Sequence, residues 1–199
     1  MTDDAQELEL ARRASQGDAR CLQDLFTRYR QRLRRMVKLR LDPRVQGRVD
    51  PSDVVQEAYL EVCRKLPDFV REPKLPFFLW LRLVTGQKLS LVHRQHLGVQ
   101  ARDAGREVSL YRGALPQASS ASLAAQLLGR LTTASQAVLN GMDPMDREIL
   151  ALRHFEGLSN GESAEILGLS KTAANNRYIR DLGRLRDLLE HVPGFFEGG

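Results

Sequence analysis

The stretch that decides the fold is Gly157-Leu-Ser-Asn-Gly-Glu-Ser-Ala-Glu-Ile-Leu-Gly-Leu-Ser-Lys-Thr-Ala-Ala-Asn-Asn-Arg-Tyr-Ile-Arg180. Ser159 and Glu162 have the spacing of a capping box, which opens a helix by satisfying its first backbone N–H groups. Gly168 is expected to end this helix, because glycine takes the left-handed conformation without the steric cost of a Cβ. Ser170 then caps a second helix. Two short helices that meet at a glycine turn predict a helix-turn-helix.

The second helix of this stretch has one apolar side, formed by Ala174, Tyr178, Leu182 and Leu185 at steps of three and four. Its other faces carry amides and cations, which form bidentate pairs with base edges and phosphates. An ordinary bundle also contains paired amphipathic helices, but its exposed faces usually carry Glu and Lys together. The polar side therefore predicts major-groove DNA binding. The candidate contacts are Lys171, Thr172, Asn175, Asn176, Arg177, Arg180 and Arg184.

The overall charge supports a polyanionic partner. The 199 residues carry a net charge of +5, and residues 28–48 contain nine Arg or Lys against one acid, Asp42. An excess of this kind favours nucleic acid as a partner. With 42% hydrophobic residues the chain has enough apolar surface for a core of its own.

Other classes of protein find little support in the sequence. Cys21 and Cys63 lack the spacing of a disulfide framework or a zinc site. His93 and His96 are three residues apart but have no carboxylate or thiol beside them. There is no glycine-rich phosphate loop and no paired acid and base, so we expect no catalytic residues, metal or cofactor. The acidic first residues do not resemble a signal peptide, and no apolar run approaches the roughly 18 residues of a membrane span. We therefore expect a cytoplasmic protein without membrane insertion.

Helical periodicity predicts two helices in the first part of the chain. A short one covers 5–16 and breaks at Gly17. A longer one begins at Ala19 and continues to Leu41, with apolar residues in register. The opposite side of the longer helix is basic, which is typical of a solvated face and also fits direct contact with DNA. The basic residues on this side are Arg28, Arg32, Arg35 and Lys38.

A third helix begins at a strong start signal. Asp50 serves as the cap, and the following proline occupies the first helical position, where its missing N–H costs nothing. Pro67 is expected to end the helix. The outer face carries Asp53, Glu57 and Glu61 at steps of four, an arrangement that slightly destabilises a lone helix. Because the like charges destabilise the helix, their presence indicates that a basic partner binds this face.

A fourth helix is predicted over 76–94, with Trp80 in the core and a polar, basic end. Periodicity is then lost over 98–122, which is rich in Gly, Ser and Pro and predicts a flexible linker. A weakly patterned helix follows at 123–139, and Asp143 and the proline after it repeat the start signal of Asp50. The predicted fold is all-α, with two small helical domains joined by a linker. The boundaries are 1–97, 98–122 and 123–192.

Three motifs, followed by the helix-turn-helix described above, resemble in this order those of bacterial RNA polymerase sigma factors. Asp53-Val-Val-Gln-Glu-Ala-Tyr resembles their core-binding helix, and Phe77-x-x-Trp-Leu-x-x-Val resembles the promoter-melting helix that follows it. Asp146-Arg-Glu-Ile-Leu-x-Leu-Arg-x-Phe-Glu-Gly-Leu-Ser is similar to the entry into their C-terminal helix-turn-helix. The short length and two-domain layout resemble the extracytoplasmic-function (ECF) group.

The resemblance implies a role in transcription initiation. Residues 1–97 would form sigma region 2 and 123–192 sigma region 4, with core RNA polymerase and promoter DNA as partners and an anti-sigma factor as a further candidate. The acidic helix would dock on a basic coiled coil of the largest polymerase subunit through Asp53, Gln56 and Glu57. The end of the fourth helix would capture an unstacked base of the downstream promoter element. The residues implied there are Gln87, Lys88, His93 and Arg94.

The chain departs from the family pattern at both DNA-contacting sites. Gln87 and Leu91 stand where the family often has Asn and Asp, and Asn175 and Asn176 replace a usual Lys-Ser pair. These departures leave the promoter sequence open.

A stand-alone helix-turn-helix regulator that binds its operator as a dimer is the main alternative. It would explain residues 143–190 but not the acidic helix or the helix of Trp80. A protein–protein adaptor would use the acidic face alone.

Overall fold

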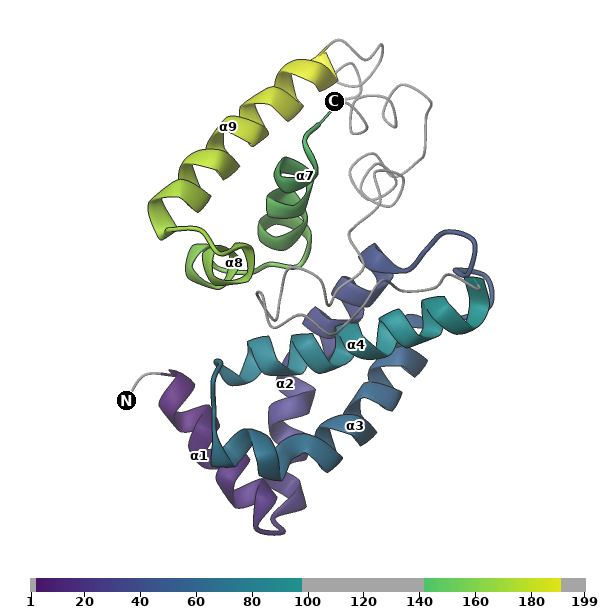
Figure 1. The fold of residues 1–199 in the computed structure, drawn as a ribbon, viewed down its shortest axis with the longest axis vertical. Coiled ribbons are helices and arrows are strands. Elements are labelled where there is room, and N and C mark those ends of the chain that lie inside the picture. The colour runs from purple at the N-terminus through teal and green to yellow at the C-terminus, as the bar shows by residue number, and fades with distance from the viewer. Residues whose placement is uncertain (1–2, 98–141, 191–199) are drawn as a thin grey trace, which may run out of the picture.

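The computed structural model describes residues 3–97 and 142–190, which contain helices and turns but no strand (Figure 1). The all-α fold predicted from the sequence is confirmed. The predicted linker over 98–122 and the helix over 123–139 lie outside the described residues. The N-terminal bundle consists of α1 (Asp3–Ser15), α2 (Ala19–Arg40), α3 (Pro51–Arg71) and α4 (Phe77–Leu97). The C-terminal unit consists of α7 (Pro144–Leu150), the π-helical turn η1 (Ala151–Phe155), α8 (Asn160–Leu167) and α9 (Lys171–Glu190).

Helix α2 forms the centre of the N-terminal bundle. Leu25, Leu33 and Val37 on its apolar side are fully buried, and α1, α3 and α4 all pack against it. The hydroxyl of Tyr29 donates a hydrogen bond to the buried carboxylate of Glu7 on α1. Burying one leucine side chain contributes roughly 1.5–3 kcal/mol, so the apolar side of α2 supplies much of the stability of the bundle.

The basic side of α2 has mixed surroundings. Arg28 lies 3.5 Å from the Glu7 carboxylate of α1, whereas Arg35 and Lys38 are exposed. Arg32 reaches the C-terminal unit, where it donates to the carbonyl oxygen of Gly157 at 3.2 Å. Part of the face is thus solvated, as one of the two sequence interpretations has it, and part is a contact between the two helical units.

The prediction that Pro67 ends the third helix is wrong, because α3 continues through Pro67 to Arg71. Proline removes one backbone hydrogen bond from a helix interior. Aromatic packing in the last turn offsets this loss. Phe69 is buried there, stacks on Trp80 at 4.3 Å between ring centroids and meets Phe77 edge to face. The assignment of Trp80 to the core is confirmed by the same contacts.

The first half of α4 is buried on all sides. Every residue from 77 to 86 is buried, including the polar Thr85 and the charged Arg82. Thr85 satisfies its hydroxyl by donating to the carbonyl oxygen of Leu81 at 2.8 Å. A helix buried all round has packing partners on more than one side. Here α2 and α3 cover one side, and Arg82 meets Glu156 of the C-terminal unit on another.

The helix-turn-helix forms as its capping signals predict. The Ser159 hydroxyl accepts from the backbone N–H of Glu162, and the Glu162 carboxylate accepts from that of Ser159, which completes the capping box. Gly168 ends α8 with φ of 64°, in the left-handed region. Ser170 caps α9 by accepting from the N–H of Ala173 at 3.1 Å. Local chemistry therefore fixes both helix boundaries at the turn.

Two glycines of this unit, Gly168 and Gly183, give opposite predictions. Gly168→Ala places a Cβ at positive φ and should lower the free energy of unfolding by about 1 kcal/mol. Gly183 lies inside α9, and an added Cβ there meets no atom within 4 Å. Gly183→Ala should therefore raise the free energy of unfolding by ~0.5–1 kcal/mol. Urea unfolding followed by circular dichroism measures both, and a stabilising Gly168→Ala would contradict the turn.

Candidate nucleic-acid and protein interfaces

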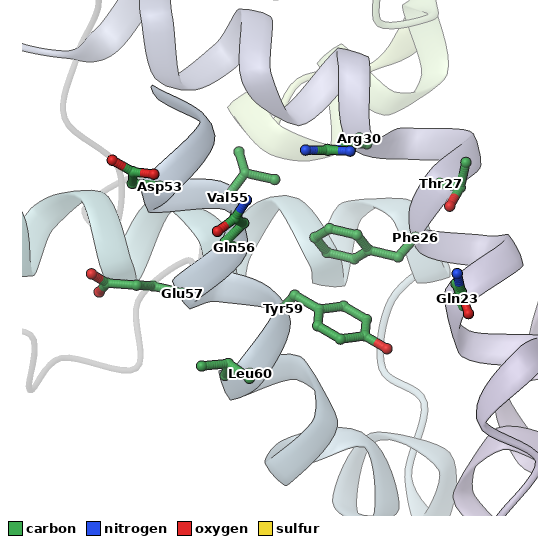
Figure 2. A pocket seen from close by; sticks show the side chains of 10 residues that line it. All are labelled: Gln23, Phe26, Thr27, Arg30, Asp53, Val55, Gln56, Glu57, Tyr59 and Leu60. Carbon is green, nitrogen blue, oxygen red and sulfur yellow. The ribbon is translucent and has the colours of Figure 1, made fainter. Parts of the chain in front are cut away.

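The first turns of α3 present an acidic face, formed by Asp53, Gln56 and Glu57. These side chains are exposed, and steps of three and four place them on one side of the helix. In Figure 2 the carboxylates of Asp53 and Glu57 point to the same side, away from α2. Glu61 is partly buried, and its pairing with Lys65 at 3.1 Å lowers its pKa. The predicted acidic run thus divides into an exposed part and a partly buried part.

A groove of about 740 Å³ lies between α2 and α3 beside this acidic face (Figure 2). Phe26 and Tyr59 line it from opposite helices, and their rings meet edge to face with 4.7 Å between centroids. Leu60 also lines it and is 58% exposed. Asp53 and Glu57 line the groove on its α3 side and Arg30 on its α2 side. A groove with apolar residues and carboxylates in its lining suits a partner helix that carries both apolar and cationic side chains.

The predicted downstream-element residues lie along the second half of α4. Gln87 and Arg94 are exposed, whereas Lys88 and His93 are partly buried. Gln87 accepts from the Lys65 ammonium at 3.2 Å. Lys88 pairs with Glu57 at 3.1 Å, which ties this end of α4 to the acidic face of α3. Two of the four residues therefore already have partners on α3.

His93 holds the loop between α2 and α3. Its Nε2 accepts from the backbone N–H of Asp42 at 3.1 Å, so the ring must be unprotonated at that nitrogen. Burial lowers the pKa of His93, and the nearby Arg44 lowers it further although Asp42 opposes the shift. The side chain therefore has a structural contact in addition to the DNA contact predicted for it.

The outer face of α9 carries side chains with free polar ends. Thr172, Asn175 and Asn176 are exposed, and their steps of three and four place them on one strip of the helix. Lys171 is exposed at the start of α9, where its carbonyl oxygen accepts from the side chain of Asn160 at 2.7 Å. The four residues thus lie on exposed parts of α9, where contact with DNA is predicted.

The predicted arginines of α9 lie at the edge of this face and converge on Asp146 of α7. Arg177 pairs with the Asp146 carboxylate, Arg180 lies 3.2 Å from it and Arg184 3.4 Å. The Asp146 side chain is 4% exposed. Asp181 is buried beside the cluster, and burial raises its pKa. One buried carboxylate thus fixes three guanidinium groups whose outer parts remain open to solvent.

Two residues of this candidate DNA-contacting region are absent from the sequence-based candidates. Ile179 is 59% exposed on the same strip as Thr172 and Asn175, but an isoleucine reads as a core residue in a periodicity pattern. Asp146 was quoted only as part of a motif. Its three partners lie more than thirty positions away, and no local spacing rule reveals such a pairing.

Comparison with known proteins identifies the family of the chain. A model of the family described as ECF sigma factor matches residues 6–184. The chain belongs to the ECF sigma factor family. It is 30% identical over 198 residues to the RNA polymerase sigma factor NccH of Alcaligenes xylosoxydans, an alignment that covers 96% of this chain and 98% of that one. It is 28% identical to the ECF RNA polymerase sigma factor ShbA of Streptomyces griseus, over 91% of this chain and 94% of ShbA.

A solved structure extends the match to the fold. The structure of CnrH in complex with the cytosolic domain of CnrY has a TM-score of 0.56 and 26% identity, and covers 92% of this chain and 97% of that one. As an ECF sigma factor the chain is a transcription initiation factor and not an enzyme. Within residues 3–97 and 142–190, no helix has the length and apolar character that a membrane crossing requires.

The lowered pKa of His93 predicts an acid-sensitive fold. Unfolding returns the ring to its ordinary pKa of 6.5, so the unfolded chain binds the proton more readily. The contribution is complete above pH 6.5 and is lost as the pH falls through the lower folded value. His93→Gln keeps a hydrogen-bond acceptor without titrating, so it should lose less stability between about pH 7 and about pH 5 in urea unfolding.

His96→Gln is the matched control, because His96 is exposed on the same helix and the change leaves His93 in place. An acid dependence that is identical in the wild type and in His93→Gln would contradict this assignment.

Proposed function

We propose that this ECF sigma factor docks on core RNA polymerase through the acidic face of α3 and reads promoter DNA through α4 and α9. Residues 1–97 would bind core polymerase, contact the downstream promoter element and melt the DNA. Residues 123–192 would contact the upstream promoter element. The observation that carries the proposal is the acidic face beside an apolar groove, which a DNA-binding regulator acting alone does not need.

Charge and shape both support polymerase docking at α3. Asp53 and Glu57 direct two carboxylates to one side, and Phe26, Tyr59 and Leu60 offer an apolar surface next to them. A basic coiled coil of the largest polymerase subunit has the complementary features. Complementary charges accelerate encounter and fix the register of binding, while apolar contacts at the centre supply affinity.

The outer strip of α9 supports reading of the upstream element as duplex DNA. Asn175 and Asn176 present amides of the kind that pair with adenine, at roughly 1–3 kcal/mol per good bidentate contact. Ile179 adds an apolar group of the kind that contacts a thymine methyl. The arginines on Asp146 stand beside the strip, where they would bind phosphates and set the register of the helix.

The second half of α4 supports contact with the downstream element. Arg94 is exposed there, and Gln87 and Lys88 hold partners on α3 that they would exchange for DNA. Since Lys88 pairs with Glu57, polymerase binding at the acidic face would release this lysine toward DNA. An anti-sigma factor is a further proposed partner, by likeness to CnrH, which was solved with the cytosolic domain of CnrY.

Charge reversal tests polymerase docking. Asp53→Lys with Glu57→Lys should abolish binding to purified core polymerase in a pull-down, because like charges would then meet across the interface. Asp68→Lys with Glu72→Lys is the matched control, since both residues are exposed at the far end of α3. Circular dichroism should show unchanged helix content in both. Full polymerase binding by the first variant would contradict docking at the acidic face.

Arg180→Ala tests upstream-element reading. Loss of one phosphate contact should weaken binding of the holoenzyme to its promoter and lower the dependence of affinity on salt by about one counterion. Arg186→Ala is the control, because Arg186 lies two turns further along and pairs with Asp187 instead of Asp146. Affinity and salt dependence are measured by fluorescence polarisation. Values unchanged from wild type would exclude Arg180 from the DNA contacts.

A further inference from the structure

A buried ion cluster joins the two helical units. The carboxylate of Glu156, just after η1, accepts from Arg40 Nε at 2.7 Å and from Arg82 Nε at 2.8 Å. Arg40 ends α2 and Arg82 lies in the first half of α4. All three side chains are 1% exposed. We call Glu156, Arg40 and Arg82 the Glu156 clamp.

The π-helical turn positions the carboxylate of the clamp. The backbone N–H of Glu156 donates to the carbonyl oxygen of Ala151 at 2.9 Å, five residues back. The wider turn carries Glu156 onto the N-terminal bundle while Leu152 stays in the core. π-Helical turns inside α-helices are rare and occur frequently at functional sites.

Two further contacts extend the clamp along the interface. Glu148 of α7 also pairs with Arg40, through Arg40 Nη1 at 3.3 Å. Arg32 of α2 donates to Glu162 of α8 at 3.4 Å, and its guanidinium lies 3.7 Å from the ring centroid of Phe78. Three arginines of the N-terminal bundle thus form ion pairs with three carboxylates of the C-terminal unit.

The opposite charges of the carboxylate and the two guanidinium groups stabilise the Glu156 clamp. Burial opposes the ionised form of Glu156, but the attraction of Arg40 and Arg82 outweighs it and lowers its pKa. Without the carboxylate, the buried guanidinium of Arg82 would lose its ion-pair partner and that of Arg40 would keep only Glu148, which is strongly unfavourable. They regain water only if the C-terminal unit leaves the bundle. Loss of Glu156 should therefore separate the two units without unfolding either.

We propose that the Glu156 clamp holds a closed form of the protein, and that the arginine surface beneath it binds the phosphate backbone of DNA when the units separate. This inference rests on the proposed function. The guanidinium groups of Arg32, Arg40 and Arg82 pair equally well with carboxylate and with phosphate, but not with both at once. In the closed form Glu156 therefore excludes DNA from this surface and covers Arg82 on α4.

The connection between the two helical units is long enough for them to separate. The 44 residues 98–141 connect α4 to the C-terminal unit, and at up to about 3.3 Å per residue they span more than ~100 Å when extended. Separation of the two units would expose the arginine surface that Glu156 covers in the closed form.

Scattering tests the closed form. Small-angle X-ray scattering of the full chain should give a compact particle for wild type and a larger radius of gyration for Glu156→Gln, with equal helix content by circular dichroism. Glu165→Gln is the matched control, because Glu165 lies exposed on α8 outside the clamp. It should remain compact. Separated units in the wild type, or an unchanged radius in Glu156→Gln, would overturn the proposal.

Binding to a fluorescein-labelled duplex of random sequence tests the arginine surface. If the closed form predominates, Glu156→Gln should bind this probe about tenfold more tightly than wild type, because the competent population rises. Adding Arg40→Ala to Glu156→Gln should reverse the gain while the radius stays large. Equal affinity of wild type and Glu156→Gln would overturn the DNA part of the proposal.

Two measurements keep the proposal separate from other failures. Should Glu156→Gln fail to fold, Arg82→Met removes one clamp cation instead, and it too should enlarge the particle; a compact Arg82→Met would then overturn the clamp. Polymerase binding by Glu156→Gln should equal that of wild type, because the acidic face of α3 is untouched. A wild type that does not bind polymerase would refute the proposed function, while the scattering result would still decide the closed form.

Discussion

The burial of helix α4 on all sides is the constraint on which the rest of the structure depends. Its residues 77–86 are all buried, and a helix of that kind folds only if other elements cover each of its faces. On one side the stacked rings of Phe69 and Trp80 attach it to α3. Helix α3 continues past Pro67 because this stacking stabilises its last turn. On another side Arg82 brings a charge into the interior, and that charge requires Glu156 of the C-terminal unit.

Carboxylates have different roles in three parts of the molecule, according to their burial and their partners. The carboxylates of Asp53 and Glu57 are exposed at the surface, where a basic partner can meet them, although Glu57 also pairs with Lys88. The carboxylate of Asp146 is buried and fixes arginines at the edge of the strip proposed to read DNA. That of Glu156 is buried between the two units and compensates cations of the other one. Solvent exposure thus separates the carboxylates that are available to a partner from those that organise the fold.

The sequence alone predicted the structure wherever that structure depends on residues close together in the chain. The capping box at Ser159, the left-handed Gly168 and the core position of Trp80 follow from local chemistry, and the all-α fold follows from periodicity. Sequence reasoning failed where a distant residue decides the outcome. Helix α3 passes Pro67 because of rings on α4, and Glu156 finds its partners 116 and 74 positions away. No spacing rule connects such residues before the fold is known.

The most direct test of the account is run-off transcription with purified core polymerase, with and without this protein, on a library of promoter fragments. The account predicts transcripts from defined start sites that appear only when the protein is present, and that the variant with Asp53 and Glu57 changed to lysine abolishes. Absence of such transcripts, together with tight binding of duplex DNA by the protein alone, would contradict it and would indicate a regulator that acts without polymerase.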